Sequence, residues 1–336
     1  MNWKSNLKEN YKFKKGDCVQ NKKIKILAIV GATASGKTAL GVELAKKFDG
    51  EVISADSMQI YQGLDITTAK PTQEEMQNIK HHLIGFQPRT ENFSVADYVN
   101  LANEKIQEVV SRGKLPILVG GTGLYIDSVL KGMQFSPEGD SQIRQKLIQR
   151  VEAEGIENLY QELQALDLEA SQKIHPNNHV RVIRALEICL ATGKSFTEYK
   201  AKNNSHESPY DVFWLGLDYA NRQDLYDKIN QRVYQMLEQG MLEEVQQAYQ
   251  QGTVGTASMA IGYKELILYL EKKASLQECI ALIQQETRRY AKRQLTWFRR
   301  NAQIQWLILS KNDELQKISE KAQKMIAKNE NMWYNV

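Results

Sequence analysis

Residues 31–38 read Gly-Ala-Thr-Ala-Ser-Gly-Lys-Thr, and they directly follow a short apolar run at residues 24–30. The segment fits the pattern Gly-x-x-x-x-Gly-Lys-Ser/Thr of a P-loop, which needs a strand before it and a helix after it. Its glycines let backbone N–H groups converge on phosphate oxygens, and the lysine and the helix N-terminus add favourable charge. A chance glycine-rich turn explains this context poorly. We therefore predict phosphate binding by Gly31, Ala32, Thr33, Ala34, Ser35, Gly36, Lys37 and Thr38.

Four short apolar runs have the length and composition of buried strands, at residues 24–30, 51–54, 116–119 and 213–217. Helical stretches separate them, and this alternation predicts a parallel sheet with ligands beyond the carboxyl ends of its strands. The predicted fold class is therefore α/β, a P-loop NTPase-like core with a parallel sheet flanked by helices, plus a helical insertion domain. We assign residues 1–23 to a flexible basic tail, 24–135 and 210–310 to the core, 136–209 to the insertion and 311–336 to a C-terminal helical tail.

The composition of the 336-residue chain is that of a soluble globular protein, with 42% hydrophobic and 25% charged residues. Its longest apolar run is far shorter than the roughly 20 residues of a membrane-spanning helix. The chain has three widely spaced cysteines, Cys18, Cys189 and Cys279. Their odd number and wide spacing argue against a disulfide framework and a zinc site. We expect no membrane partner, a cytoplasmic location and a monomer. Because the net charge is only +4, nucleic-acid binding would depend on local clusters of basic residues.

Two further strand ends place polar residues beside the P-loop. Asp56 follows residues 51–54, where it could orient Mg²⁺ as in an ordinary NTPase or act as a general base. Its position alone does not decide between these roles. The run at residues 116–119 ends in Gly-Gly-Thr122-Gly, which offers no acidic metal ligand. From the pattern alone we expect Thr122 to cap the following helix.

Residues 287–300 contain six basic residues, three aromatic residues and no acid. On a helix, Arg288 and Lys292 share one face, as do Arg289 and Arg293. Such a stripe can contact a nucleic-acid backbone while its aromatic rings pack in the core or stack on bases. The alternative is a solvated helix face, and the pattern leaves both open.

A second basic cluster, Arg181 and Arg184, has the same two interpretations. The histidines His81, His82 and His175 could suggest a metal site, but no third ligand has fitting spacing. We expect structural roles for these histidines.

Taken together, these segments resemble the tRNA dimethylallyltransferase family, whose members prenylate the adenosine adjacent to the anticodon. The resemblance covers about residues 24–300. The P-loop is not specific to this family, but its combination with Ser-Ala-Asp-Ser, Gly-Gly-Thr-Gly-Leu-Tyr and Arg-Tyr-Ala-Lys-Arg-Gln is highly specific. There is no zinc-finger extension of the kind seen in eukaryotic relatives, so we expect a bacterial-type enzyme. Further matching segments lie at residues 53–61, 65–71, 81–84, 93–97, 116–125, 173–177, 181–187 and 261–265.

The resemblance implies that residues 31–38 grip the diphosphate of dimethylallyl diphosphate rather than a nucleotide to be hydrolysed, with Mg²⁺ as the cofactor and Thr38 as its ligand. It implies that Asp56 is the general base for the adenine amine, that Thr122 orients this amine and that Arg232 lies near the diphosphate. The implied partner is the tRNA anticodon stem-loop. The implied tRNA-binding residues are Asp56, Ser57, Met58, Gln59, Thr122, Arg144, Arg181, Arg184, Arg288, Arg289, Lys292 and Arg293.

The sequence departs from the family pattern at three places. Ala32 stands where proline is frequent, Thr67 where glycine is usual and Gly85 where aspartate is common. None of these removes a proposed catalytic group. Two rival functions are a small-molecule kinase, which predicts phosphate transfer from ATP, and an RNA-binding protein with a regulatory nucleotide pocket, which predicts tRNA affinity without covalent change.

Overall fold

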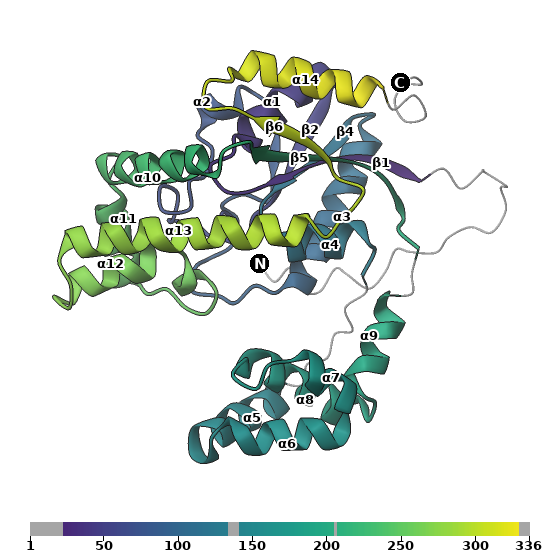
Figure 1. The fold of residues 1–336 in the computed structure, drawn as a ribbon, viewed down its shortest axis with the longest axis vertical. Coiled ribbons are helices and arrows are strands. Elements are labelled where there is room, and N and C mark those ends of the chain that lie inside the picture. Colours follow the sequence, from purple (N-terminus) through teal and green to yellow (C-terminus); the bar gives the residue numbers. More distant parts are fainter. Residues whose placement is uncertain (1–22, 134–140, 205–206, 329–336) are drawn as a thin grey trace, which may run out of the picture.

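The computed structural model describes residues 23–133, 141–204 and 207–328. Its centre is a β-sheet (Figure 1). The sheet has six strands in the order β3-β2-β4-β1-β5-β6, and every neighbouring pair is parallel. This confirms the predicted α/β class. The strands are β1 (Ile24–Gly31), β2 (Gly50–Ala55), β3 (His81–His82), β4 (Leu115–Gly120), β5 (Tyr210–Tyr219) and β6 (Gln305–Leu309).

Helices cover both faces of the sheet because the strands are apolar on both faces. In β1, the side chains of Leu27 and Ile29 join one buried cluster, whereas Ile26, Ala28 and Val30 join the other, as the two-residue period of a strand requires. The first face is covered by α1 (Lys37–Lys47) and α14 (Leu315–Ala327), and the second by α3 (Val95–Ser111) and α4 (Gly123–Leu130) (Figure 1). Buried residues of α11 (Met241–Gln251) and α12 (Tyr263–Leu270) extend the cluster of the second face.

Two more helices pack against the sheet and against each other: α10 (Arg222–Glu238) contacts β5, and α13 (Leu276–Phe298) contacts β1. The 23-residue helix α13 begins with a capping box, in which Ser275 and Glu278 bind each other's backbone N–H groups at 3.3 and 2.8 Å. Its buried residues enter both clusters, so α13 ties the two faces together. Short helices α2 (Gln73–Met76) and η2 (Ala257–Met259) complete the core.

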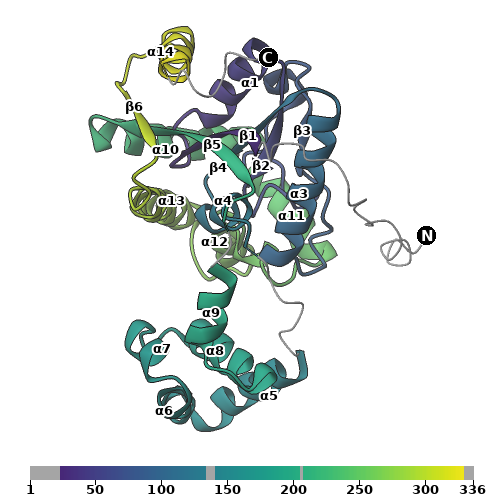
Figure 2. The ribbon, with the colours of Figure 1, turned by 90° about the vertical axis from the view of Figure 1, so that its right-hand side faces the viewer.

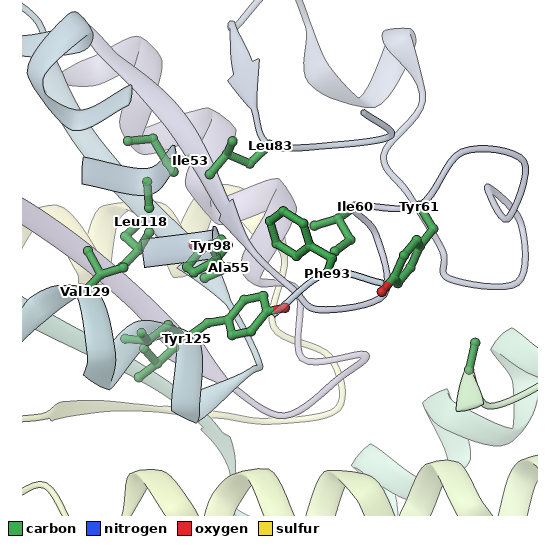
Figure 3. Packing of buried hydrophobic residues seen from close by; sticks show 14 of the residues in the cluster. Ile53, Ala55, Ile60, Tyr61, Leu83, Phe93, Tyr98, Leu118, Tyr125 and Val129 are labelled. Carbon is green, nitrogen blue, oxygen red and sulfur yellow. The ribbon is translucent and has the colours of Figure 1, made fainter. Parts of the chain in front are cut away.

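Aromatic rings pack among aliphatic side chains beside β2 and β4 (Figure 3). The rings of Tyr98 and Tyr125 stack at 4.1 Å between centroids, and the Tyr98 hydroxyl donates a hydrogen bond of 2.9 Å to the carbonyl of Ser54. Ser54 lies two residues before Asp56. This packing therefore fixes the carboxyl end of β2, from which the site begins.

The helical insertion forms a separate group below the core (Figures 1 and 2). It has its own buried cluster, which includes Leu147, Leu159, Leu163 and Leu186. The chain positions on either side of it lie close together, because a Cβ added at Gly132 would lie 2.8 Å from Cδ of Pro209. The helices are α5 (Ser141–Glu154), α6 (Ile156–Leu166), α7 (Leu168–Lys173), α8 (His179–Thr192) and α9 (Phe196–Asn204).

Three features differ from the sequence-based expectation or extend it. Strand β3 was not predicted, because its two residues are polar and one of them depends on a buried hydrogen bond, in which His82 Nε2 lies 2.7 Å from Glu51 Oε2. Strand β6 was not predicted either. Helix α14 buries Ala322 and Ile326 against the sheet, so residues 315–327 are a layer of the core and not a tail.

Other observations concern the expected tail, cysteines and membrane partner. Residues 1–22, including Cys18, lie outside the described residues. Cys189 and Cys279 are buried free thiols. Among the described helices, none has the length and apolar character needed to cross a membrane.

Candidate active site

The P-loop connects the central strand β1 to α1. Gly31 has φ 147° and a Cβ there would lie 2.6 Å from the carbonyl oxygen of Leu217, so a side chain is excluded. Gly36 has φ 88° at the N-cap of α1, in the left-handed region that glycine tolerates best. These two glycines turn the loop back over the helix N-terminus, where its N–H groups can converge on an anion.

Lys37 is the first residue of α1 and its ammonium group folds back to donate a hydrogen bond to the carbonyl of Ala32. Burial lowers the pKa of Lys37 to about 8, although the nearby Asp56 carboxylate acts in the opposite direction. Arg232 on α10 also lowers this pKa by repulsion. The pKa of Arg232 is itself lowered by burial, against the opposing effects of Glu75 and Asp56. Lys37 and Arg232 therefore share this site with the carboxylates of Asp56 and Glu75.

Asp56 and Thr122 lie at the ends of adjacent strands, β2 and β4. Oδ1 of Asp56 accepts hydrogen bonds from the backbone N–H groups of Met58 at 2.9 Å and Gln59 at 3.3 Å. Oγ1 of Thr122 accepts a bond of 3.0 Å from the N–H group of Ser57. Thr122 occupies the N-cap position of α4 but makes no side-chain capping bond. The expectation from pattern alone that it caps this helix is therefore wrong, because its hydroxyl instead holds the segment after Asp56.

The residues on both sides of Thr122 are glycines because α13 packs too close to them to leave room for a side chain. A Cβ at Gly121 would lie 2.1 Å from Nε2 of Gln294, and one at Gly123 would lie 2.3 Å from Cδ1 of Trp297. The buried Gln294 donates to the carbonyl of Gly121 at 3.0 Å and accepts from the N–H group of Thr33 at 2.8 Å. One side chain thus joins the P-loop to the glycine turn.

Two adjoining cavities meet at Asp56. The first, of about 400 Å³, is lined by the P-loop and by polar side chains of α10, including Lys228 and Arg232. The second, of about 320 Å³, has an apolar wall. Thr33, Ala34, Asp56, Thr68 and Arg232 line both cavities. The apolar wall consists of Ile229, Val233, Met236, Met241, Ile261 and Ile283. The site therefore offers a phosphate-binding chamber and an apolar chamber with a carboxylate between them.

Residues 59–301 match the family described as IPP transferase. The chain belongs to this family. It is 48% identical over 290 residues to a tRNA dimethylallyltransferase of Caldanaerobacter subterraneus subsp. tengcongensis, covering 85% of this chain and 92% of the relative. It is 46% identical to a tRNA dimethylallyltransferase of Halalkalibacterium halodurans, covering 89% and 95% of the two chains.

Solved structures of IPP transferase relatives have the same fold. The crystal structure of a tRNA isopentenylpyrophosphate transferase from Bacillus halodurans is 44% identical, with a TM-score of 0.69 over 92% of this chain and 98% of the other. A eukaryotic dimethylallyltransferase, described as acting on tRNA, is 30% identical, with a TM-score of 0.79 over 92% and 79% of the chains.

Tyr290 is a site residue that the sequence did not single out. It lines the apolar chamber, and burial raises the pKa of its hydroxyl, as does the nearby Asp56. The hydroxyl is close enough to Thr122 and Gln294 for both to act on its pKa. The guanidinium of Arg293 lies 5.7 Å from the centroid of the ring. The available signal was its place in the basic stripe one helical turn before Gln294.

The basic side chains of α13 differ in their contacts and exposure. Arg288 donates a bond of 2.5 Å to Oδ1 of Asn230, and Arg289 forms an ion pair of 2.6 Å with Glu286. Lys292 and Arg293 are exposed, and Arg293 also lines the apolar chamber. The stripe therefore presents positive charge at the rim of the site.

The predicted tRNA-binding residues of the insertion are not brought to the two chambers. Arg144 on α5 and Arg181 on α8 are exposed. Arg184 forms an ion pair of 3.0 Å with the buried Glu187, so its charge is partly used within the insertion. In contrast, the structure brings Ser57 and Met58 to the apolar chamber and Gln59 to the phosphate-binding chamber.

The oxygen donors of the phosphate-binding chamber suit Mg²⁺. Thr38 lines this chamber, and Oγ of Ser35 is buried without a hydrogen-bond partner in the described part of the chain. The described residues contain no group of three or more His, Cys, Asp or Glu side chains arranged to hold a metal ion. A cation here would thus depend on few protein ligands and on phosphate oxygens, which is how proteins commonly bind Mg²⁺.

Proposed function

We propose that this IPP transferase family member transfers the dimethylallyl group of dimethylallyl diphosphate to the exocyclic amine of the adenosine adjacent to the anticodon of tRNA, and releases diphosphate. The observation that carries this proposal is the position of Asp56, which lines both the phosphate-binding chamber and the apolar chamber. The names of the similar proteins support the same reaction.

The phosphate-binding chamber is suited to a diphosphate leaving group. Negative charge grows on the departing oxygen as the bond between the prenyl carbon and oxygen breaks. The amides of the P-loop, Lys37 and Arg232 are already in place to stabilise that charge, so little reorganisation is needed during the reaction. Mg²⁺, held by the Thr38 hydroxyl and by diphosphate oxygens, would neutralise a further part of it.

The apolar chamber is suited to the prenyl group and the incoming base. The amine nitrogen forms a bond to the prenyl carbon and loses one proton, for which Asp56 is the proposed acceptor. Amides of Met58 and Gln59 hold Oδ1 of Asp56, which leaves Oδ2 as the oxygen that takes the proton. Thr122, fixed by the Ser57 amide, is the proposed group that orients the amine.

The proposed RNA partner is the anticodon stem-loop. The reacting adenine has to leave its stack to enter the chamber, and a base in a single-stranded loop does so at low cost. Lys292 and Arg293 at the rim are the proposed contacts with the RNA backbone. A single chain lines both chambers, which supports a monomer as the working unit.

The proposal is tested with Asp56→Asn, which keeps the shape of the side chain and removes the base. We expect turnover to fall by about 100- to 10,000-fold, while the affinity for an anticodon stem-loop changes little. The measurement is the mass of one prenyl group added to the stem-loop in the presence of dimethylallyl diphosphate. Asp227→Asn, an exposed change on α10, is the control.

Three outcomes would contradict the proposal. Wild-type turnover in Asp56→Asn would show that this carboxylate is not the base. Consumption of ATP without prenyl transfer would favour a small-molecule kinase. Stem-loop binding without any covalent change would favour an RNA-binding protein.

A further inference from the structure

A loop at residues 65–69 forms a wall of both chambers. Thr67, Thr68 and Ala69 line the apolar chamber, and Thr68 also lines the phosphate-binding chamber. The loop is a tight turn, closed by a bond of 2.9 Å from the N–H group of Lys70 to the carbonyl of Asp65. Ala69 has φ 51°, a conformation that a residue with a side chain rarely adopts. Such a turn needs contacts from its surroundings to keep this shape.

The outer side of the loop is held by Glu244, a partly buried residue on α11. Its Oε2 accepts hydrogen bonds from the N–H groups of Asp65 at 2.6 Å and Ile66 at 2.8 Å, and its Oε1 accepts one from Thr67 at 2.8 Å. Three successive amides thus surround one carboxylate, in the manner of a backbone anion-binding nest. Hydrogen bonds of this kind are charge-assisted and are roughly twice as strong as neutral ones.

The inner side of the loop is held by Gln59. Its Nε2 donates to the carbonyls of Ala69 at 2.9 Å and Thr68 at 3.3 Å, and its backbone N–H donates to Oδ1 of Asp56 at 3.3 Å. Glu244 is therefore linked to the carboxylate of Asp56 by hydrogen bonds to the loop, by the loop backbone itself and by the hydrogen bonds of Gln59. Glu244 itself lines neither chamber.

We infer that Glu244 is a positioning residue, which sets the shape of the chamber wall at residues 67–69 and, through Gln59, the orientation of Asp56. The inference rests on the proposed function for its kinetic part. Loss of the carboxylate leaves the loop free to move into or away from the chambers. The prenyl donor then binds less tightly and Asp56 is less well aligned, whereas RNA contacts on α13 are unaffected.

The test compares Glu244→Gln with Glu243→Gln. Glutamine has the shape of glutamate, but it loses the charge and turns one acceptor into a donor that faces N–H groups. Glu243 is the preceding residue on α11, is exposed and makes none of these three bonds, so it is a matched control. Glu244→Asp keeps the charge on a shorter side chain and should recover part of the loss.

Hydrogen exchange gives a reading that does not depend on catalysis. We expect the amides of residues 65–67 to exchange at least about tenfold faster in Glu244→Gln than in wild type, with no change in Glu243→Gln. Exchange at the wild-type rate would overturn the inference. If the wild-type protein transferred no prenyl group, the proposed function would fail, and this measurement would still decide whether Glu244 anchors the loop.

Kinetics separate positioning from a general loss of stability. We expect KM for dimethylallyl diphosphate to rise about tenfold and kcat to fall in Glu244→Gln, with an unchanged Kd for the stem-loop. A lower melting temperature with wild-type KM and kcat per folded enzyme would indicate a merely structural role and overturn the inference. Equal losses in Glu244→Gln and Glu244→Asp would also contradict it, because the charge would then not matter.

Discussion

Lys37 is charged at a buried position, where both burial and the nearby Arg232 disfavour its protonated form. Burial brings its pKa down from the ordinary 10.5 to about 8, so the side chain is mostly protonated at pH 7. A folded pKa below the unfolded one means that the unfolded chain binds more protons between these values. The contribution of Lys37 to stability is therefore unfavourable below pH 8 and improves as the pH rises from 8 towards 10.5. A bound diphosphate would add countercharge to that of the Asp56 carboxylate and stabilise the protonated Lys37.

This electrostatic cost predicts a pH dependence of diphosphate binding. Above pH 8 the free protein has to take up a proton at Lys37 before it binds, so the Kd of pyrophosphate should increase about tenfold per pH unit. Calorimetric titrations at pH 7, 8 and 9 measure this. The same series on Lys37→Gln corrects for the titration of pyrophosphate itself. An identical Kd for the wild-type protein at pH 7 and pH 9 after this correction would show that Lys37 does not hold the anion.

Residues that act on backbone groups far away in the chain were the hardest to foresee from the sequence. The P-loop, Asp56 and Thr122 could be placed at the site because each follows an apolar run that predicts a strand. Gln294 and Glu244 could not, because each acts on backbone groups more than 170 residues away in the chain. No spacing pattern encodes such pairs, and only the packing of α13 and α11 against the core shows them.

At the scale of elements, helix α13 combines two surfaces. Its buried side carries Gln294, Leu295 and Phe298 against the core, and its exposed side carries Lys292 and Arg293. The helix that braces the P-loop is thus also the one that presents positive charge to solvent. Arg289 contributes less free charge to this surface, because it is paired with Glu286.

The exposed charge of α13 predicts how RNA binding depends on salt. Removing one phosphate contact by Lys292→Ala should weaken stem-loop binding and reduce the slope of log K against log salt by about one. Kd values measured from low to moderate salt give this slope. Lys317→Ala removes an exposed lysine from α14, a helix that lines neither chamber. Equal effects of the two changes would argue for binding by net charge alone.

The sequence predicted the strands that are long, apolar and central in the sheet. It did not predict the two strands at the sheet edges, β3 and β6. The four runs that became β1, β2, β4 and β5 are apolar and central. Strand β3 has two polar residues, and its pairing depends on Glu51, which a hydrogen bond from His82 and an ion pair with Arg112 hold. Strand β6 lies at the sheet edge, beside β5. It follows the long helix α13 closely, so its few apolar residues did not stand out from the helical pattern of the sequence.

At the scale of the whole molecule, the insertion has a buried cluster of its own that does not depend on the sheet. The chain positions on either side of it, Gly132 and Pro209, lie close together. A unit with its own core and adjacent ends is expected to fold without its host, and its host without it. The arginines of the insertion lie outside both chambers, so they can affect RNA binding without affecting the binding of the diphosphate.

We therefore expect a chain in which a linker of about four Gly and Ser residues replaces residues 133–207 to remain folded. Its Kd for dimethylallyl diphosphate should stay within about twofold of the wild-type value, while its Kd for the stem-loop should rise by at least about tenfold. Circular dichroism on heating and titrations with each ligand measure these quantities. Loss of the cooperative melting transition would show that the core needs the insertion.

The position of β1 at the centre of the sheet also has a consequence for synthesis of the chain. β1 pairs with β4 on one side, but its other partner, β5, begins only after the insertion. The chain from Gly120 to Tyr210 takes roughly 5 to 20 s to emerge at about 5 to 20 residues per second. During that interval one side of β1 has no strand to pair with, and such edges invite aggregation. The length of the insertion thus sets how long the nascent chain exposes an unpaired edge of β1 on the ribosome, while the insertion itself folds from local contacts.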